Sequence, residues 1–237
     1  MARLTRPDAL LFDFGGTLFD DEFDVAAGEK RMIELAEGEF DPDEYMRIAR
    51  ELAADIHLRR LESQIEHAAA RFTRLVGDCV GASFPQSDSE LDLEFWKAAE
   101  VCTPVPGARD IIEMVASERV PLGIVSNLTF GREVLAYELE KVGWQGYFTT
   151  IVSSSDYGIR KPHAALFRAC AGRMGVDPAR CWYVGNWAAV DVTGAQSAGM
   201  AGIWLNRHGE ALPEGVTPDA VITSWAGFAD LWRDTAR

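Results

Sequence analysis

The chain has 237 residues, of which 48% are hydrophobic and 25% charged, a composition typical of globular proteins that excludes the disordered and collagen-like classes. Its 23 Lys and Arg residues against 37 Asp and Glu residues give a net charge of −14, so we expect no binding to nucleic acid or to an anionic membrane. No apolar run approaches the roughly 18 residues of a membrane helix, no signal peptide is evident, and the four cysteines form no C-x-x-C pair; these features predict a cytoplasmic protein with free thiols.

The first predicted elements are a short strand and a long helical insertion. Residues 9–14 form an apolar run that predicts the strand. Residues 19–100 hold 21 acidic and 9 basic side chains, and from residue 25 to about residue 80 apolar positions recur every three or four residues. This spacing is typical of amphipathic helices, and a last helix is predicted over residues 91–101. The acidic run at residues 20–24 predicts a solvated hinge into the insertion.

After the insertion, short apolar runs alternate with helical stretches. The predicted strands cover residues 121–125, 147–152, 181–184, 202–205 and 220–223, and the predicted helices cover residues 108–117, 132–142, 162–174, 188–198 and 225–233. This alternation favours a doubly wound α/β fold, with a parallel sheet covered on both faces. We therefore predict an α/β core domain made of residues 1–19 and 101–237, interrupted by an all-helical domain over residues 20–100.

Polar side chains follow four of the predicted strands. They are Asp13 after the first, Ser126 and Asn127 after the second, Lys161 beyond the third, and Asn186 with Asp191 beyond the fourth. Each of these residues, taken alone, is more often part of a turn, a helix cap or a solvated helix start than of a functional site. Because ligands bind beyond the carboxyl ends of parallel strands, their occurrence at successive strand ends favours one common site.

With these residues in place, the sequence resembles the haloacid dehalogenase (HAD) superfamily. The resemblance lies in Asp13-x-x-Gly16-Thr17-Leu18, Ser126-Asn127, Lys161-Pro162 and Gly185-x5-Asp191, which are similar to the four motifs of that family. The helical insertion is similar to the family's C1-type cap. The resemblance implies a Rossmann-like core with an inserted helical cap, an active site at their junction, and hydrolysis of a small-molecule substrate.

The resemblance also implies catalytic roles. Asp13 is the nucleophile and forms a covalent aspartyl intermediate. Lys161 supplies a fixed ammonium beside it. Ser126 and Asn127 donate hydrogen bonds to the phosphoryl oxygens of a phosphate ester, and Thr17 orients the loop after the first strand.

A magnesium ion is the cofactor that the resemblance implies. Its expected ligands are Asp13, the main-chain carbonyl of Gly15 and the side chain of Asn186, with Asp191 as an outer carboxylate that orients metal-bound water or Lys161. Phosphatases of the family have an aspartate at the position of Gly15, which acts as general acid and base, and another at the position of Asn186. Both carboxylates are missing from this sequence, which predicts slower turnover of poor leaving groups and a weakened metal site.

Three functions are therefore open. A Mg²⁺-dependent phosphatase of small phosphomonoesters is the first, and a metal-independent 2-haloacid dehalogenase is the second. For the second, Arg31, Arg47 and Arg50 are conceivable ligands of the substrate carboxylate. The third is a HAD-fold binding or regulatory protein without turnover. The sequence contains no feature that predicts an oligomeric state.

Overall fold

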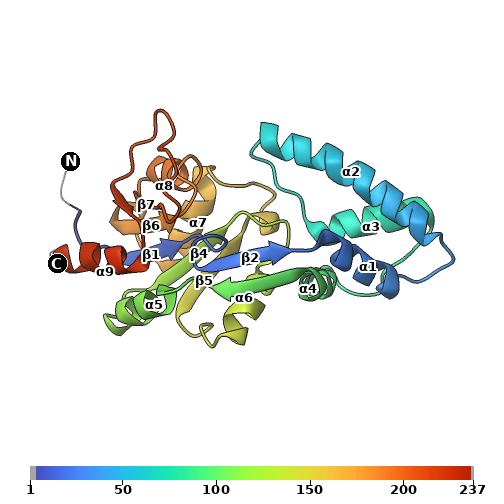
Figure 1. Ribbon diagram of the computed structural model, residues 1–237, viewed down its shortest axis with the longest axis horizontal. Coiled ribbons are helices and arrows are strands. Elements are labelled where there is room, and N and C mark those ends of the chain that lie inside the picture. The colour runs from blue at the N-terminus through green and yellow to red at the C-terminus, as the bar shows by residue number, and fades with distance from the viewer. Residues whose placement is uncertain (1–3, 236–237) are drawn as a thin grey trace.

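A six-stranded parallel sheet forms the centre of the molecule. The computed structural model describes residues 4–235, except for the side chains at positions 61 and 62. The strands follow the order β5-β4-β1-β6-β7-β8 and are all parallel (Figure 1). Their bounds are Ala9–Phe12 for β1, Leu122–Ser126 for β4, Phe148–Ser153 for β5, Cys181–Gly185 for β6, Ala201–Leu205 for β7 and Ala220–Ile222 for β8. The predicted doubly wound α/β fold is confirmed.

Helices cover both faces of this sheet because the side chains of each strand alternate between the faces. In β1, Leu10 and Phe12 belong to a core that includes one set of helices, and Ala9 and Leu11 belong to a core that includes the other set. The first set is α5 (Ala108–Ser117), α6 (Arg132–Lys141) and α9 (Trp225–Asp234), and the second is α7 (Ala164–Met174) and α8 (Asp191–Ala198). The two sets lie below and above the sheet in Figure 1.

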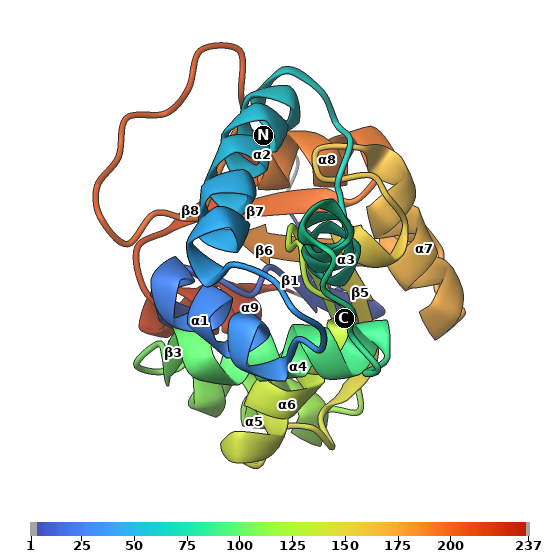
Figure 2. The same cartoon turned by 90° about the vertical axis from the view of Figure 1, so that its right-hand side faces the viewer.

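Four helices form the predicted insertion between β1 and the rest of the core. They are α1 (Val25–Leu35), α2 (Pro42–Glu62), α3 (Ala69–Val80) and α4 (Asp88–Ala99), and they lie to one side of the sheet in Figure 1 and in front of it in Figure 2. Asp41 caps α2, and Pro42 occupies its first turn, as this sequence pattern favours. Helix α4 begins three residues earlier than predicted because Ser87 and Glu90 form a capping box.

A two-stranded antiparallel ribbon connects these helices to the core. Strand β2 (Phe19–Phe23) pairs with β3 (Glu100–Pro104), so both ends of the helical segment leave the core side by side. The helix predicted up to residue 101 ends at Ala99, because residue 100 begins β3. Residues 20–23 of the predicted hinge are exposed, as expected, and belong to a strand; their role as a hinge stays a prediction. Four of the five residues of β2 are exposed, so this strand has no run of buried apolar residues. Its partner strand lies about eighty residues further along the chain.

Two helix starts in the core also lie later than predicted. Pro162 does not open a helix: His163 is the N-cap of α7, and its Nδ1 accepts a hydrogen bond from the main-chain N–H of Ala165. Helix α8 begins at Asp191, so residues 186–190 form a loop at the end of β6. Short 3₁₀ turns, Ser154–Asp156 and Pro178–Arg180, complete the core.

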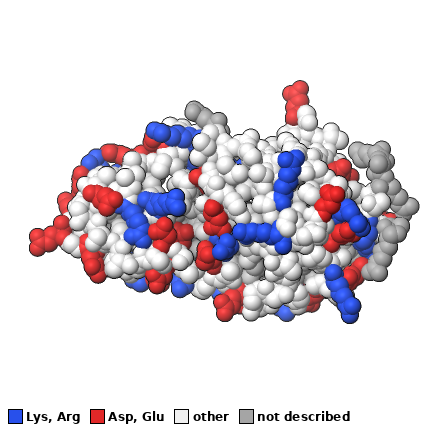
Figure 3. All heavy atoms as spheres, turned by 180° about the vertical axis from the view of Figure 1, so that it is seen from behind, with Lys and Arg blue, Asp and Glu red and all other residues white. Residues whose placement is uncertain are grey.

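Acidic and basic side chains lie close to one another on the surface. On the face shown in Figure 3, acidic and basic side chains are interspersed. On α2, for example, Arg47 pairs with Glu44 and with Glu51, both at 2.7 Å. Within residues 4–235, no helix is both long enough and apolar enough to cross a bilayer.

Candidate functional site

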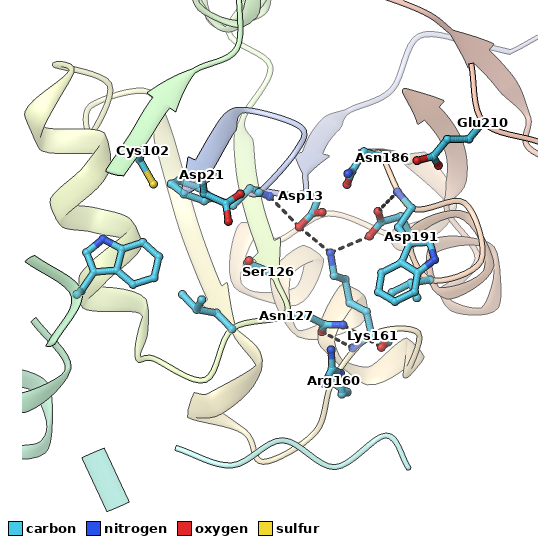
Figure 4. Close-up of a pocket in the computed structure, with 16 residues that line it drawn as sticks. Asp13, Asp21, Cys102, Ser126, Asn127, Arg160, Lys161, Asn186, Asp191 and Glu210 are labelled. Atoms are coloured by element: carbon cyan, nitrogen blue, oxygen red, sulfur yellow. Dashed lines mark hydrogen bonds and ion pairs between the residues drawn. The ribbon is translucent and has the colours of Figure 1, made fainter. Parts of the chain in front are cut away.

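A buried lysine joins two of the predicted strand-end carboxylates. The Lys161 ammonium donates hydrogen bonds to Asp13 Oδ1 at 2.8 Å and to Asp191 Oδ1 at 2.7 Å (Figure 4). It also donates to Tyr183 Oη at 2.9 Å. The Tyr183 hydroxyl donates in turn to the carbonyl of Val125 at 2.8 Å. Lys161 is only 3% exposed, so one ammonium is held between two carboxylates almost without water. The expected convergence of these residues at one sheet edge is present.

The end of β1 directs one carboxylate oxygen of Asp13 toward the cleft. The Asp13 main-chain N–H donates to the Val184 carbonyl at 2.9 Å, which ties the end of β1 to β6. Oδ1 accepts from the Phe14 N–H and from Lys161, both at 2.8 Å. Oδ2 accepts no hydrogen bond from any residue that the structure describes. Asp13 therefore has one anchored oxygen and one available oxygen, as a nucleophile or a metal ligand requires.

Burial and pairing set the protonation of this cluster. Burial raises the pKa of Asp13 to about 6, although Lys161 opposes this shift. Burial would lower the pKa of Lys161, but the carboxylates of Asp13 and Asp191 outweigh that effect and raise it. Lys161 therefore stays an ammonium at neutral pH and can offset negative charge on a substrate.

Asp191 is completely buried at the first turn of α8. Its Oδ1 accepts from Lys161, and its Oδ2 accepts from the Trp187 N–H at 2.9 Å. A Cβ atom on Gly185 would lie 2.4 Å from the Asp191 carboxylate, so only glycine leaves room for it. Because both oxygens are in use, this geometry supports the role of orienting Lys161 more than direct contact with a metal.

Asn127 holds the lysine loop in a way that the sequence did not predict. Its Oδ1 accepts from the Lys161 main-chain N–H at 2.6 Å, and its Nδ2 donates to the Lys161 carbonyl at 3.0 Å. The expected hydrogen bond from this amide to a substrate would break that pairing, so the geometry favours a positioning role. Ser126, one residue earlier, lines the cleft, and its hydroxyl has no partner among the described residues, so it remains available to a ligand.

The loops after β1 and β6 touch each other at Asn186. Its Oδ1 accepts from the Thr17 hydroxyl at 3.3 Å. Gly16 has a positive φ of 70°, and a Cβ atom there would lie 2.2 Å from the Asn186 amide nitrogen, so glycine is required at this contact. Among the residues described, no three His, Cys, Asp or Glu side chains are grouped as a metal site. Any cation here would rely on Asp13, the Asn186 amide oxygen and main-chain carbonyls.

A cleft of about 460 Å³ is lined by all the predicted site residues except Thr17, and by further residues that the sequence did not single out. The additional polar ones are Asp21, Cys102, Arg160 and Glu210, and the apolar ones include Trp96 and Leu128. Desolvation, together with the charge of Asp20, raises the pKa of Asp21. The alternation of Phe19, Asp21 and Phe23 is the sequence signal that could have revealed this carboxylate. The arginines considered for a carboxylate substrate, at positions 31, 47 and 50, do not line the cleft.

A second buried charge cluster borders the cleft at Arg160. Glu66, whose side chain is fully buried, lies 2.8 Å from Arg60 Nε and 3.9 Å from Arg160 Nη1, and it accepts from the Ser154 hydroxyl at 3.0 Å. Main-chain hydrogen bonds run from Glu66 to the Gly158 carbonyl and from Arg160 to the carbonyl of residue 64. The loop between α2 and α3 is therefore fastened to the loop that carries Arg160 and Lys161.

Comparisons with known proteins agree on one family. The family model described as haloacid dehalogenase-like hydrolase matches residues 7–199. The pyrimidine 5'-nucleotidase YjjG of Escherichia coli (strain K12) is 30% identical over 224 residues, which cover 92% of this chain and 94% of the relative. A 2-haloacid dehalogenase from Pseudomonas syringae pv. Tomato DC3000 superimposes with a TM-score of 0.67 at 22% identity over 95% of this chain and 97% of that one. A HAD phosphatase from Thermococcus onnurineus gives 0.62 at 23% identity over 96% and 98%; at these identities the two structures show the shared fold.

Proposed function

Because the chain belongs to the haloacid dehalogenase-like hydrolase family, we propose that it hydrolyses small phosphate monoesters with Asp13 as nucleophile. The observation that carries this proposal is the position of Asp13: one carboxylate oxygen is anchored by Lys161 and the Phe14 N–H, and the other accepts no hydrogen bond from a described residue, in a cleft that Ser126 also lines. A relative that is similar over nearly the full length, a nucleotidase by name, supports a phosphate ester as substrate. Membership of a hydrolase family favours turnover over the binding-protein hypothesis.

The chain's own residues have distinct tasks in this reaction. Asp13 Oδ2 attacks phosphorus, and the Lys161 ammonium offsets the charge that gathers on the transferring group. Asp191 and Tyr183 hold that ammonium in place, and the Asn127 amide holds its main chain. The Ser126 hydroxyl can donate to a phosphoryl oxygen. The helical segment, joined through the β2–β3 ribbon, is proposed to cover the cleft as a cap and exclude bulk water.

The site fits a magnesium ion with fewer charged ligands than the family pattern implies. The contact between Asn186 and Gly16 brings an amide oxygen close to the loop that carries Asp13 and the Gly15 carbonyl. These three groups would hold the ion, with water completing its coordination, because Mg²⁺ commonly keeps several waters. When bound, the ion supplies positive charge to the phosphoryl oxygens. We assign Asp191 the role of orienting Lys161 and not that of a metal ligand, since both of its carboxylate oxygens already accept hydrogen bonds.

Dehalogenation of a 2-haloacid is the second candidate. Gly15 and Asn186 remove two carboxylates that a phosphatase of this family has, and displacement of halide needs no proton donor for the leaving group. Arg160, and not the arginines considered from the sequence, is the guanidinium that lines the cleft and could receive the carboxylate of such a substrate.

Turnover in ¹⁸O-labelled water separates the two reactions. A phosphatase cleaves p-nitrophenyl phosphate, is inhibited by chelator, and places the label in the released phosphate. A dehalogenase releases halide from a 2-haloacid in the presence of chelator and places the label in the Asp13 carboxylate, because water attacks the carbonyl carbon of the ester. Activity on haloacids alone, with labelled protein, would overturn the phosphatase proposal.

A further inference from the structure

The inner face of the β2–β3 ribbon presents a carboxylate between two aromatic side chains. Side chains alternate along β2, so Phe19, Asp21 and Phe23 share one face and Asp20 lies on the other. Phe19 is fully buried, and Phe23 contacts the rings of an aromatic cluster that includes Phe130. Asp20 faces outward and is held in an ion pair, whereas Asp21 lines the cleft.

Asp21 enters the cleft where Gly15 leaves space. Its Oδ1 lies 3.3 Å from the point that a Cβ atom on Gly15 would occupy, and Gly15 is two residues beyond Asp13. Figure 4 shows the Asp21 carboxylate directed into the cleft, on the side where Asp13 and Ser126 lie. A carboxylate from the ribbon therefore lies next to the nucleophile loop at a point where that loop has no side chain.

The other carboxylates of the cleft have different surroundings. Asp13 is the proposed nucleophile, and Asp191 has both oxygens in hydrogen bonds. Glu210 comes from the loop after β7 and lies on the side of Asn186 (Figure 4). Asp21 forms no ion pair within the part of the chain that the structure describes. Because its exposed side chain lines the cleft, its carboxylate is accessible for proton exchange with a ligand.

We propose that Asp21 is the general acid and base of the phosphate ester hydrolysis proposed above, on which this inference rests. In the first step, the Asp13 Oδ2–phosphorus bond forms and the ester P–O bond breaks. The electron pair of that bond stays on the leaving oxygen, which takes the proton of Asp21. In the second step, water attacks phosphorus and gives a proton to the Asp21 carboxylate, and Asp13 departs as a carboxylate. One water is consumed, and alcohol and phosphate are released.

The test uses the dependence of rate on the leaving group in Asp21→Asn. A poor leaving group needs the proton and a good one does not, and general acid catalysis typically contributes about 10²–10⁴-fold. We expect kcat/KM for phenyl phosphate to fall by about 10²-fold or more, and kcat/KM for p-nitrophenyl phosphate to fall by less than about threefold. Retained cleavage of the activated ester shows that the variant is folded with an intact nucleophile.

Two further variants make the test specific. Asp20→Asn, which changes the neighbouring carboxylate paired with Arg207, should leave the ratio of the two rates unchanged. Adding Gly15→Asp to Asp21→Asn should restore phenyl phosphate cleavage by roughly tenfold or more, because a carboxylate returns to the same space.

The outcomes separate this inference from the proposed function. Equal losses on both esters, no loss on either, or a selective loss in Glu210→Gln in place of Asp21→Asn would overturn the role of Asp21 alone. A wild-type protein that cleaves neither ester with Mg²⁺ present would overturn the phosphatase proposal, and the role of Asp21 with it.

Discussion

Two buried charge clusters border the cleft, and their charges are balanced in opposite directions. Around Lys161, one cation is shared by two carboxylates, Asp13 and Asp191. Around Glu66, one carboxylate is shared by two cations, Arg60 and Arg160. In the first cluster Asp13 keeps one carboxylate oxygen without a hydrogen bond from a described residue, and in the second the Arg160 guanidinium pairs with Glu66 only at 3.9 Å. Asp13 and Arg160 both line the cleft. The comparison teaches that each buried cluster leaves one charge unbalanced next to the cleft, negative around Lys161 and positive around Glu66.

Removing the nucleophilic carboxylate oxygen of Asp13 should have the largest effect on activity. Asp13→Asn keeps the size of the side chain and lacks a nucleophilic oxygen, so we expect kcat to fall by roughly 10⁴-fold or more. Steady-state kinetics on the best substrate measures the loss, and unfolding in urea checks that the fold persists. Turnover that survives this substitution would contradict the assignment of Asp13 as nucleophile.

Removing the shared cation should reduce stability in a pH-dependent way. Lys161→Met leaves two buried carboxylates facing each other without a partner, which we expect to cost about 3–5 kcal/mol. The pKa of Asp13 is already about 6, above the 3.8 of an unfolded chain, and loss of the ammonium raises it further. A carboxyl group with a raised folded-state pKa stabilises the fold at low pH and loses that contribution as the pH rises through the folded value. Urea unfolding should therefore show a larger loss at pH 8 than at pH 5.

A double variant provides the control for this effect. In the Asp13→Asn background, Lys161→Met leaves only one unpaired carboxylate, so its stability cost and its pH dependence should both be smaller. An equal cost at pH 5 and pH 8 in the single variant would show that packing, and not charge, dominates at this position.

Removing the shared carboxylate of the second cluster should cost less. Glu66→Gln leaves Arg60 and Arg160 without a counter-charge, but their side chains are 22% and 17% exposed and keep some hydration, so we expect about 2 kcal/mol. Arg160 lines the cleft and would lose its ion-pair partner, so KM should rise while kcat changes little. Asp55→Asn, which breaks a surface pair with the 74% exposed Arg59, is the matched control and should change neither quantity measurably.

A third buried carboxylate, which pairs with no cation among residues 4–235 as far as their side chains are described, should show the smallest effect. Asp92 on α4 accepts from the main-chain N–H of Ala70 at 3.0 Å and of Gly131 at 2.7 Å, and so joins the helical segment to the core. Asn offers one acceptor where two are needed, so Asp92→Asn should cost about 1–2 kcal/mol.

The pH dependence at Asp92 has a predictable sign. Burial raises its pKa to about 6, so its contribution to stability declines as the pH rises from 4.5 to 7.5. The cost of Asp92→Asn should therefore be greater at pH 4.5 than at pH 7.5, as measured by thermal unfolding. A cost that grows with pH would contradict the assigned direction of the shift.

Most of the fold and half of the site were accessible from the sequence. Each core strand was predicted because a buried parallel strand is a local run of apolar residues. The convergence of Asp13, Lys161 and Asp191 followed from the shared edge of parallel strands. The ribbon was missed because β2 and β3 each lack a continuous apolar run, and only their pairing across the helical segment makes them a strand pair.

By itself, the sequence determined a parallel sheet with a helical insertion and the set of polar residues at its carboxyl edge, because strand periodicity and strand-end position are encoded within a few neighbouring residues. Tertiary structure alone decided how those side chains are used: that Asn127 binds the Lys161 main chain, that Glu66 supports Arg160, and that Asp21 lies beside Gly15. The physical reason is that hydrogen bonds and ion pairs depend on distances of about 3 Å between segments far apart in the chain, and such distances are set only when the elements pack.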